Sequence, residues 1–210
     1  MNCLTSHQCP EWAPNISTST MERPTLASIS ASATSLVGQL LLCPKTANKG
    51  DAGLLLERLT GIPTSSALLD ALDGEVKIFP VKTLRNGERV PKETVAVTML
   101  NHEALASTCW DESHCATKLR RVLFVPYERE GDHIRLLPPI LFSQESHAEL
   151  FVALAADYAS IQTEWLTKGE LHGHTGVLMQ SRTKGPGGNA KKTRAFYLRP
   201  AFLKQVVELN

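Results

Sequence analysis

The sequence carries almost no net charge, and this shortage already excludes one class of function. In 210 residues, 22 Lys and Arg stand against 21 Asp and Glu, which leaves a formal net charge of +1. A histone-like or polybasic protein, which binds its partner through bulk charge, is therefore excluded. A nucleic-acid enzyme is not excluded, because such an enzyme concentrates its charge locally.

Paired cysteine motifs are also lacking. None of the cysteines forms a C-x-x-C pair, and no two histidines are separated by three to five residues, which argues against a structural zinc site. An odd number of cysteines in a chain of this size indicates reduced thiols of an intracellular protein. The five are Cys3, Cys9, Cys43, Cys109 and Cys115.

Long hydrophobic runs are missing as well. The longest, Leu36 to Cys43, is interrupted by Gly38 and Gln39 and is too short to span a bilayer. The first ten residues contain neither Lys or Arg nor a continuous apolar run, so they do not resemble a signal peptide. We therefore predict a cytoplasmic protein without membrane contact.

Length and composition predict one folded domain behind a tail. Between Ile16 and Ser35, ten of twenty positions are Ser or Thr, a composition that does not offset the entropy of ordering. We expect residues 1–35 to be a flexible Ser/Thr-rich tail, in which a late helical turn can join the core, and residues 36–210 to form a single domain. A segment of 210 residues is long enough for such a domain to bury a sizeable core.

Hydrophobic periodicity in the domain predicts an α/β arrangement with a mixed sheet. We expect a helix over Ala52–Arg58, capped by Asn48, and a long helix that starts at a Ser146-x-x-Glu149 capping box and ends at Gly169. The expected strands are 75–79, 95–100 and 121–126, with an edge strand within 135–142, and the apolar segments 177–179 and 196–198 flank a loop.

The segment Asp70 to Lys77 contains the residues with the clearest chemistry. Residues two apart in a strand point to the same side, so Glu75 and Lys77 project together, and an Asp just before the strand can reach that edge. Two carboxylates can hold Mg²⁺, and a lysine beside the metal can orient a water and neutralise a phosphoryl group. Taken alone, so short a pattern is more often a solvated turn and strand face.

Two residues of the preceding helix add to this pattern. Lys49 lies at the helix start, where free backbone amides and a lysine favour a phosphate. Glu57 follows about two turns later and can join the carboxylates. An ordinary helix start and a solvated Glu57-Arg58 pair are the alternatives.

Several collinear blocks between residues 45 and 205 resemble a known family. The first is Asn48-Lys49-Gly50-x-x-Gly53-x-Leu55-Leu56-Glu57, and the second runs from Asp70 through Gly74-Glu75-Val76-Lys77-x-x-Pro80-Val81. Further blocks are Glu93-Thr94-x-x-Val97, Trp110-x-x-Ser113-His114-x-x-x-Lys118-Leu119-x-Arg121-Val122-Leu123-x-x-Pro126 and Phe196-Tyr197-Leu198. The set is similar to the MutH family of DNA mismatch-repair endonucleases and related type II restriction enzymes. The resemblance implies a restriction-endonuclease-like α/β fold, in which helices flank a central mixed β-sheet and a C-terminal arm binds DNA.

The same resemblance implies roles for individual residues. Asp70 and Glu75 match the metal-binding carboxylates, although the interval between them is shorter than in the family and leaves Asp73 as an alternative. The remaining matches are Lys77 as the catalytic lysine, Glu57 and Lys49 as the helix residues that complete the active site, Lys118 as a lysine of DNA contact and activity, and Arg182 and Tyr197 in the arm that reads bases and senses adenine methylation.

A basic loop supports DNA binding independently of the resemblance. Residues 182–194 contain three glycines and no acid, so their backbone can approach a sugar-phosphate chain closely. A mobile solvated loop is the alternative. The five basic residues are Arg182, Lys184, Lys191, Lys192 and Arg194. The pair His172 and His174 has no accompanying carboxylate or cysteine in the sequence, so a loop is predicted there and not a metal site.

These observations predict a monomeric, Mg²⁺-dependent endonuclease that hydrolyses double-stranded DNA at a short site. A GATC-type site is implied by resemblance alone. One alternative is a methyl-directed mismatch-repair nickase activated by a MutL-type partner, in place of a stand-alone restriction enzyme. A more distant alternative is a non-catalytic DNA-binding module.

Overall fold

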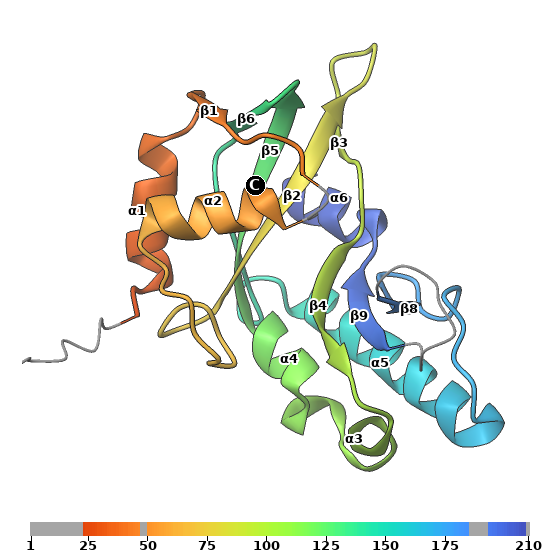
Figure 1. Ribbon diagram of the computed structural model, residues 1–210. Coiled ribbons are helices and arrows are strands. Elements are labelled where there is room, and N and C mark those ends of the chain that lie inside the picture. Colours follow the sequence, from red (N-terminus) through yellow and green to blue (C-terminus); the bar gives the residue numbers. More distant parts are fainter. Residues whose placement is uncertain (1–22, 47–49, 185–192, 209–210) are drawn as a thin grey trace, which may run out of the picture.

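The computed structural model describes residues 23–46, 50–184 and 193–208, and within them the strands form two sheets (Figure 1). The larger sheet has six strands in the order β1-β6-β5-β2-β3, with β7 also paired to β5, and the smaller has the order β4-β9-β8. The strands are β1 Leu40–Leu42, β2 Glu75–Thr83, β3 Arg89–Pro91, β4 Val95–Leu100, β5 Arg121–Glu130, β6 His133–Leu136, β7 Ile140–Ser143, β8 Met179–Thr183 and β9 Arg194–Leu198.

Helices cover both faces of the larger sheet. In Figure 1, α1 and α2 lie on one face, while α6 lies behind it and α3, α4 and α5 surround the smaller sheet. The helices are α1 Leu26–Ser35, α2 Asp51–Thr60, α3 His102–Ser107, α4 His114–Leu119, α5 Ala148–Lys168 and α6 Pro200–Glu208, with a short 3₁₀ turn, η1, at Trp110–Glu112. None of the described helices is long and apolar enough to cross a membrane.

The parallel pair of β2 and β5 is the centre of the larger sheet. Glu75 pairs with Val122 and Lys77 with Phe124, whereas β6 and β7 run antiparallel to β5. Along β2, Val76 packs toward α1 and α2 while Phe79 packs toward the opposite core, as the two-residue period of a strand requires. The predicted mixed sheet is therefore confirmed.

The folded part of the chain begins earlier than predicted. Leu26, Ile29 and Ala33 recur at helical spacing on α1 and are fully buried against α2 and the larger sheet. Thr25 caps this helix by accepting a hydrogen bond from the backbone N–H of Ser28. The expected boundary at residue 36 is wrong, because the serines and threonines occupy the exposed face of an amphipathic helix. Residues 1–22 lie outside the described part of the chain.

Two local predictions also need correction. The edge strand expected within 135–142 is divided into β6 and β7, because Pro138 and Pro139 lack the N–H groups that a ladder needs. The capping box is wrong: α5 begins after His147, and the Ser146 hydroxyl contacts Ser143 and His147 instead of a helix amide. Gly169 ends α5 in the left-handed conformation, as predicted.

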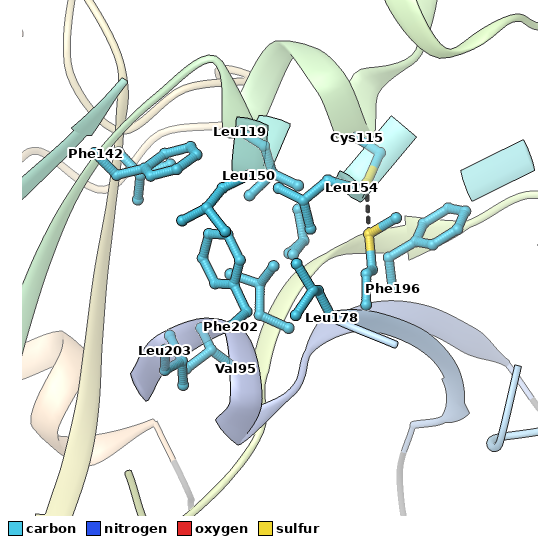
Figure 2. Packing of buried hydrophobic residues seen from close by; sticks show 14 of the residues in the cluster. Val95, Cys115, Leu119, Phe142, Leu150, Leu154, Leu178, Phe196, Phe202 and Leu203 are labelled. Atoms are coloured by element: carbon cyan, nitrogen blue, oxygen red, sulfur yellow. Dashed lines mark hydrogen bonds between the residues drawn. The ribbon is translucent and has the colours of Figure 1, made fainter. Parts of the chain in front are cut away.

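A second core joins the smaller sheet to the larger one. Figure 2 shows Leu154 of α5 beside Cys115 of α4, whose Sγ lies 3.5 Å from the Sδ of Met179. Phe202 of α6 packs on Phe142 of β7 in the same core. This packing fixes α4, and therefore Lys118, beside the start of β2.

Candidate active site

Glu75, the first residue of β2, is at the centre of the site. Its side chain is only 1% exposed, yet it carries a carboxylate. One oxygen, Oε1, accepts hydrogen bonds from the Nζ of Lys77 at 2.6 Å and from the Nζ of Lys118 at 2.7 Å. Two lysines from different elements thus converge on one buried carboxylate oxygen.

The other oxygen of Glu75 has no comparable partner. Oε2 is buried, and no hydrogen-bond donor among the described residues reaches it. An unsatisfied carboxylate oxygen is costly to bury, and a hard cation is a ligand that would satisfy it. The residues present therefore fit a divalent metal.

Asp70 lies beside the same strand start. Its Oδ2 accepts a hydrogen bond of 3.1 Å from the backbone N–H of Val76, so the turn between the two residues folds Asp70 back toward β2. Asp73, the alternative ligand, accepts a hydrogen bond from the N–H of Leu26 at 2.7 Å and pairs with Arg121 at 2.9 Å. The structure thus places Asp70 beside Glu75, whereas Asp73 is hydrogen-bonded to the start of α1.

Gly74 makes this turn possible. A Cβ atom at this position would lie 2.6 Å from the backbone carbonyl oxygen of Arg121 and would also collide with the side chain of Leu26. Only glycine allows the turn to approach β5 and α1 so closely. The local sequence Asp73-Gly74-Glu75 therefore sets where Glu75 enters the sheet.

Glu57 of α2 is the third acidic side chain predicted for this site, after Glu75 and Asp70. Burial raises its pKa, the negative charge of Asp70 raises it further, and the positive charge of Lys77 opposes the shift. The charges of Asp70 and Lys77 therefore act on Glu57, and its role in the active site stays a prediction. Lys49, the other helix residue predicted for this site, lies outside the described residues, and so does Asn48.

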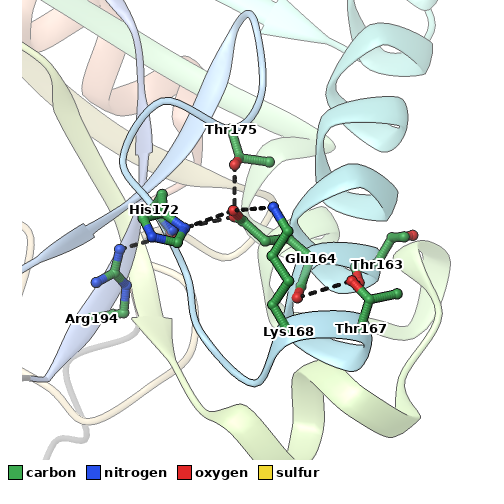
Figure 3. A network of polar contacts seen from close by, with 8 residues as sticks. Thr163, Glu164, Thr167, Lys168, His172, Thr175 and Arg194 are labelled. Carbon is green, nitrogen blue, oxygen red and sulfur yellow. Dashed lines mark hydrogen bonds and ion pairs between the residues drawn. The ribbon is translucent and has the colours of Figure 1, made fainter.

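Within residues 23–46, 50–184 and 193–208, no group of three His, Cys, Asp or Glu side chains lies close enough together to hold a metal ion. The pair Asp70 and Glu75 is compatible with this finding, because Mg²⁺ is held by one or two carboxylates and keeps several waters. His172 instead forms a polar network with Glu164 of α5, shown in Figure 3, in which Nδ1 lies 2.8 Å from Glu164 Oε1. The loop interpretation of His172 and His174 agrees with this arrangement.

The predicted DNA-reading residues lie on the smaller sheet. The guanidinium of Arg182 stands 5.6 Å from the ring centre of Tyr197 and donates a 3.0 Å hydrogen bond to the hydroxyl of Thr94. Lys184 is exposed at the end of β8, where its N–H bonds to Thr193. Arg194 is half-buried, and its guanidinium donates a 3.4 Å hydrogen bond to the hydroxyl of Ser181. Lys191 and Lys192 are outside the described residues.

An anchor on α5, which sequence reasoning missed, holds the start of β8. The buried carboxylate of Asp157 accepts hydrogen bonds from the backbone N–H groups of Val177, Leu178 and Met179 at 2.6–2.8 Å. Gly176, with a φ of +87°, makes the turn that aims these groups at Asp157. The sequence offered one signal for this anchor, an Asp within the apolar stretch of a predicted helix. Its partners could not be identified from the sequence, because they lie about twenty residues away.

The resemblance implied that Lys118 acts in DNA contact and activity, and the structure adds a direct contact with Glu75 that the sequence did not predict. Its side chain is 14% exposed and lies within the active site. The contact depends on the packing of α4 against β5, which cannot be read from local spacing.

Comparison with known proteins agrees with this geometry. The family profile described as "DNA mismatch repair enzyme MutH" matches residues 64–140. The DNA mismatch repair protein MutH of Haemophilus influenzae (strain PittGG) is 30% identical over 184 residues, covering 76% of this chain and 79% of the relative. The chain belongs to the MutH family. Its mixed sheet with flanking helices is accordingly a restriction-endonuclease-like fold.

Other MutH relatives show similar coverage. The DNA mismatch repair protein MutH of Vibrio cholerae (serotype O1, strain M66-2) is 28% identical over 185 residues, covering 77% of this chain and 80% of the relative. The MutH protein of Pasteurella multocida (strain Pm70) is 26% identical over the same number of residues, with the same shares covered.

Proposed function

We propose that this MutH-family chain is a Mg²⁺-dependent endonuclease that nicks one strand of double-stranded DNA at a short, GATC-type site. The observation that carries the proposal is the state of Glu75. A buried carboxylate with two lysines on one oxygen and an unpartnered second oxygen is an arrangement suited to phosphodiester hydrolysis.

Asp70 and Glu75 would hold the metal. Bound there, Mg²⁺ would lower the pKa of a coordinated water and stabilise charge on the phosphoryl oxygens. Glu57 would add a third acidic group beside them, and burial together with the charge of Asp70 raises its pKa. Lys49, which precedes α2 in the sequence, would bind a phosphate of the substrate.

Lys77 would act on the attacking water and the phosphate. An ammonium group has three donors, and one of those on Lys77 is used by Glu75, which leaves two for a water and a phosphoryl oxygen. The water oxygen bonds to phosphorus, one of its protons passes to solvent, and the bond to the 3′ oxygen breaks. That oxygen takes up a proton, so the products are a 5′-phosphate and a 3′-hydroxyl.

The described residues contain one such carboxylate–lysine centre, which supports one strand cut per binding event. A monomer with one centre fits a mismatch-repair nickase better than a restriction enzyme, which must cut both strands. The relatives are named DNA mismatch repair proteins, which supports the same choice. We therefore propose activation by a MutL-type partner, with Arg182 and Tyr197 reading the site and its adenine methylation, and with Lys184, Lys191, Lys192 and Arg194 contributing to DNA binding.

A plasmid assay tests this function. The full chain is incubated with Mg²⁺ and with unmethylated, hemimethylated or fully methylated plasmid, with and without a MutL-type protein, and nicked and linear products are scored. We expect slow nicking of unmethylated and hemimethylated DNA that rises with the partner. Linear product without any partner would identify a restriction enzyme, and cutting that persists in EDTA would rule out the metal.

Glu75→Gln is the decisive variant, with Glu170→Gln as its matched control, because Glu170 is an exposed loop residue. We expect Glu75→Gln to lower nicking roughly 10²–10³-fold while DNA binding persists. A wild type that binds DNA but cuts no better than Glu75→Gln would indicate a non-catalytic binding module.

A further inference from the structure

A cavity outside the active site lies at the far end of β2. It has a volume of about 610 Å³ and opens between the end of β2, the connection from β3 to β4, the end of β5 and the segment that leads into α2. It is lined chiefly by charged side chains. The cationic ones are Lys45, Lys82, Lys92 and Arg129, and the acidic ones are Glu93, Glu128 and Glu130.

Most of the acidic charge in this cavity is neutralised by residues that do not line it. Arg89 pairs with Glu128 at 3.1 Å, and Arg135 pairs with Glu130 at 3.1 Å. Among the described residues, Glu93 is the one lining acid with no hydrogen-bond or ion-pair partner. The acidic side of the cavity therefore contributes about one uncompensated negative charge.

The cationic side chains are not neutralised in the same way. Lys45, Lys82 and Lys92 are exposed, and within the described part of the chain no carboxylate lies in ion-pair distance of any of them. Arg129 donates a hydrogen bond to the carbonyl oxygen of Cys43 and lies over the ring of Tyr127, and no acid among the residues that the structure describes pairs with it. The cavity thus presents a surplus of positive charge to a ligand.

The cavity and the active site share one strand. Lys77 and Lys82 are five residues apart on β2, which corresponds to about 17 Å at roughly 3.3 Å per residue. A duplex advances about 3.4 Å per base pair along each strand, so a span of this length corresponds to about five base pairs. Lys45 lies on the segment entering α2, the helix that carries Glu57 toward the active site.

We propose that this cavity is a binding site for phosphodiester groups of DNA that flanks the cut site. The proposal rests on the endonuclease function above and adds a flank contact to it. Lys45, Lys82 and Lys92 bind backbone phosphates about five base pairs from the scissile bond, without reading bases. The contact lengthens the DNA footprint and raises affinity for long duplexes.

The test compares two duplexes with the full chain in the absence of Mg²⁺, where binding is measured without cutting. One duplex ends about three base pairs from the scissile phosphate, and the other extends about twelve base pairs beyond it on each side. We expect Lys82→Gln, Lys92→Gln and Lys45→Gln each to lower the slope of log affinity against log salt by about 0.9 on the long duplex. On the short duplex the same variants equal the wild type.

Lys168→Gln is the matched control, since Lys168 is an exposed lysine of α5 far from β2 in the sequence, and it should leave both duplexes unchanged. Equal salt slopes for wild type and the three variants on the long duplex would overturn the proposal. Binding of inorganic phosphate tests whether the site takes a free anion instead of DNA. If phosphate binds to the three lysines while the wild type binds the long and the short duplex with equal affinity, the assignment to DNA is wrong. Because binding is measured separately, loss of nicking alone would count against the endonuclease function and not against this site.

Discussion

At the scale of single residues, the arrangement around Glu75 separates two roles for Lys118. A lysine that only contacts DNA would face solvent and improve binding. Lys118 instead donates to the same Glu75 oxygen as Lys77 and is largely covered. We therefore expect it to position the carboxylate and to support the chemical step.

This expectation leads to a kinetic prediction for Lys118→Gln. Removing one of the two cations on Glu75 Oε1 leaves the carboxylate less firmly oriented, so kcat should fall by roughly 10²-fold while KM for DNA changes less. Lys118→Arg should restore part of kcat, because it returns a charged donor. Single-turnover nicking rates at saturating DNA give the measurement.

A comparison variant sharpens that result. Lys184→Gln, at the end of β8, should weaken DNA binding with little change in kcat. If Lys118→Gln behaves in the same way, with a raised KM and normal kcat, Lys118 is a DNA contact and not a positioning residue.

At the scale of elements, α5 organises the arm that carries Arg182. Asp157 accepts three backbone hydrogen bonds at the start of β8, and seven residues later Glu164 accepts from His172 and from Thr175. Seven residues are two helical turns, so both carboxylates lie on the same side of α5. One helix face therefore fixes the whole connection from Gly169 to β8.

Asp157→Asn tests this anchor. The change keeps the shape but removes the negative charge and replaces one acceptor oxygen by a donor, which opposes the amides of residues 177–179. We expect the free energy of unfolding to fall by about 2–3 kcal/mol, as for the loss of hydrogen bonds to a buried charge. Denaturant unfolding measures this fall, and hydrogen exchange should report faster opening at residues 177–179.

The control for Asp157→Asn is Glu149→Gln on the exposed side of the same helix. A surface change of this kind should alter the free energy of unfolding by no more than about 0.5 kcal/mol. Equal stability of the two variants would show that Asp157 does not anchor β8.

Prediction from sequence was uneven at this scale, for identifiable reasons. Strands such as β2 and β5 are apolar and β-branched, so their positions followed from local pattern. The Ser/Thr-rich α1 was missed because its three buried residues are spread thinly among polar ones. The capping box failed because Ser146 found closer partners in Ser143 and His147.

At the scale of the whole molecule, the buried network of Glu164 links stability to pH. Burial raises the pKa of Glu164, but hydrogen bonds from Thr175 and His172 outweigh it and lower the pKa to about 2 from an ordinary value of 4.5. The folded state therefore binds this proton more weakly than the unfolded state. The resulting stability is complete above about pH 4.5 and is lost as the pH falls toward 2.

Glu164→Gln isolates that contribution. We expect the variant to be less stable than the wild type by about 2 kcal/mol at pH 7, and this difference should shrink as the pH falls from 4.5 toward 2. Urea unfolding at several pH values, with Glu170→Gln as control, measures the difference. A gap between variant and wild type that stays constant with pH would contradict the linkage.

Charge distribution at this scale also differs from the average that the composition suggests. Residues 182–210 hold seven basic residues and one acid, whereas the rest of the chain is net acidic. The near-zero total is therefore the sum of an acidic body with the Glu75 site and a basic C-terminal end. The β2 cavity adds a further concentration of positive charge within that body.

The sequence by itself determined the family, the mixed sheet, and the strand pair of Glu75 and Lys77, because these depend on short-range spacing and periodicity. Only the tertiary structure decided that Asp73 serves α1, that Lys118 reaches Glu75, and that Asp157 holds β8. Each of those contacts joins residues at least twenty positions apart. The packing of helices on the two sheets decides which residues Asp73, Lys118 and Asp157 contact, and this packing cannot be predicted from the local sequence around each residue.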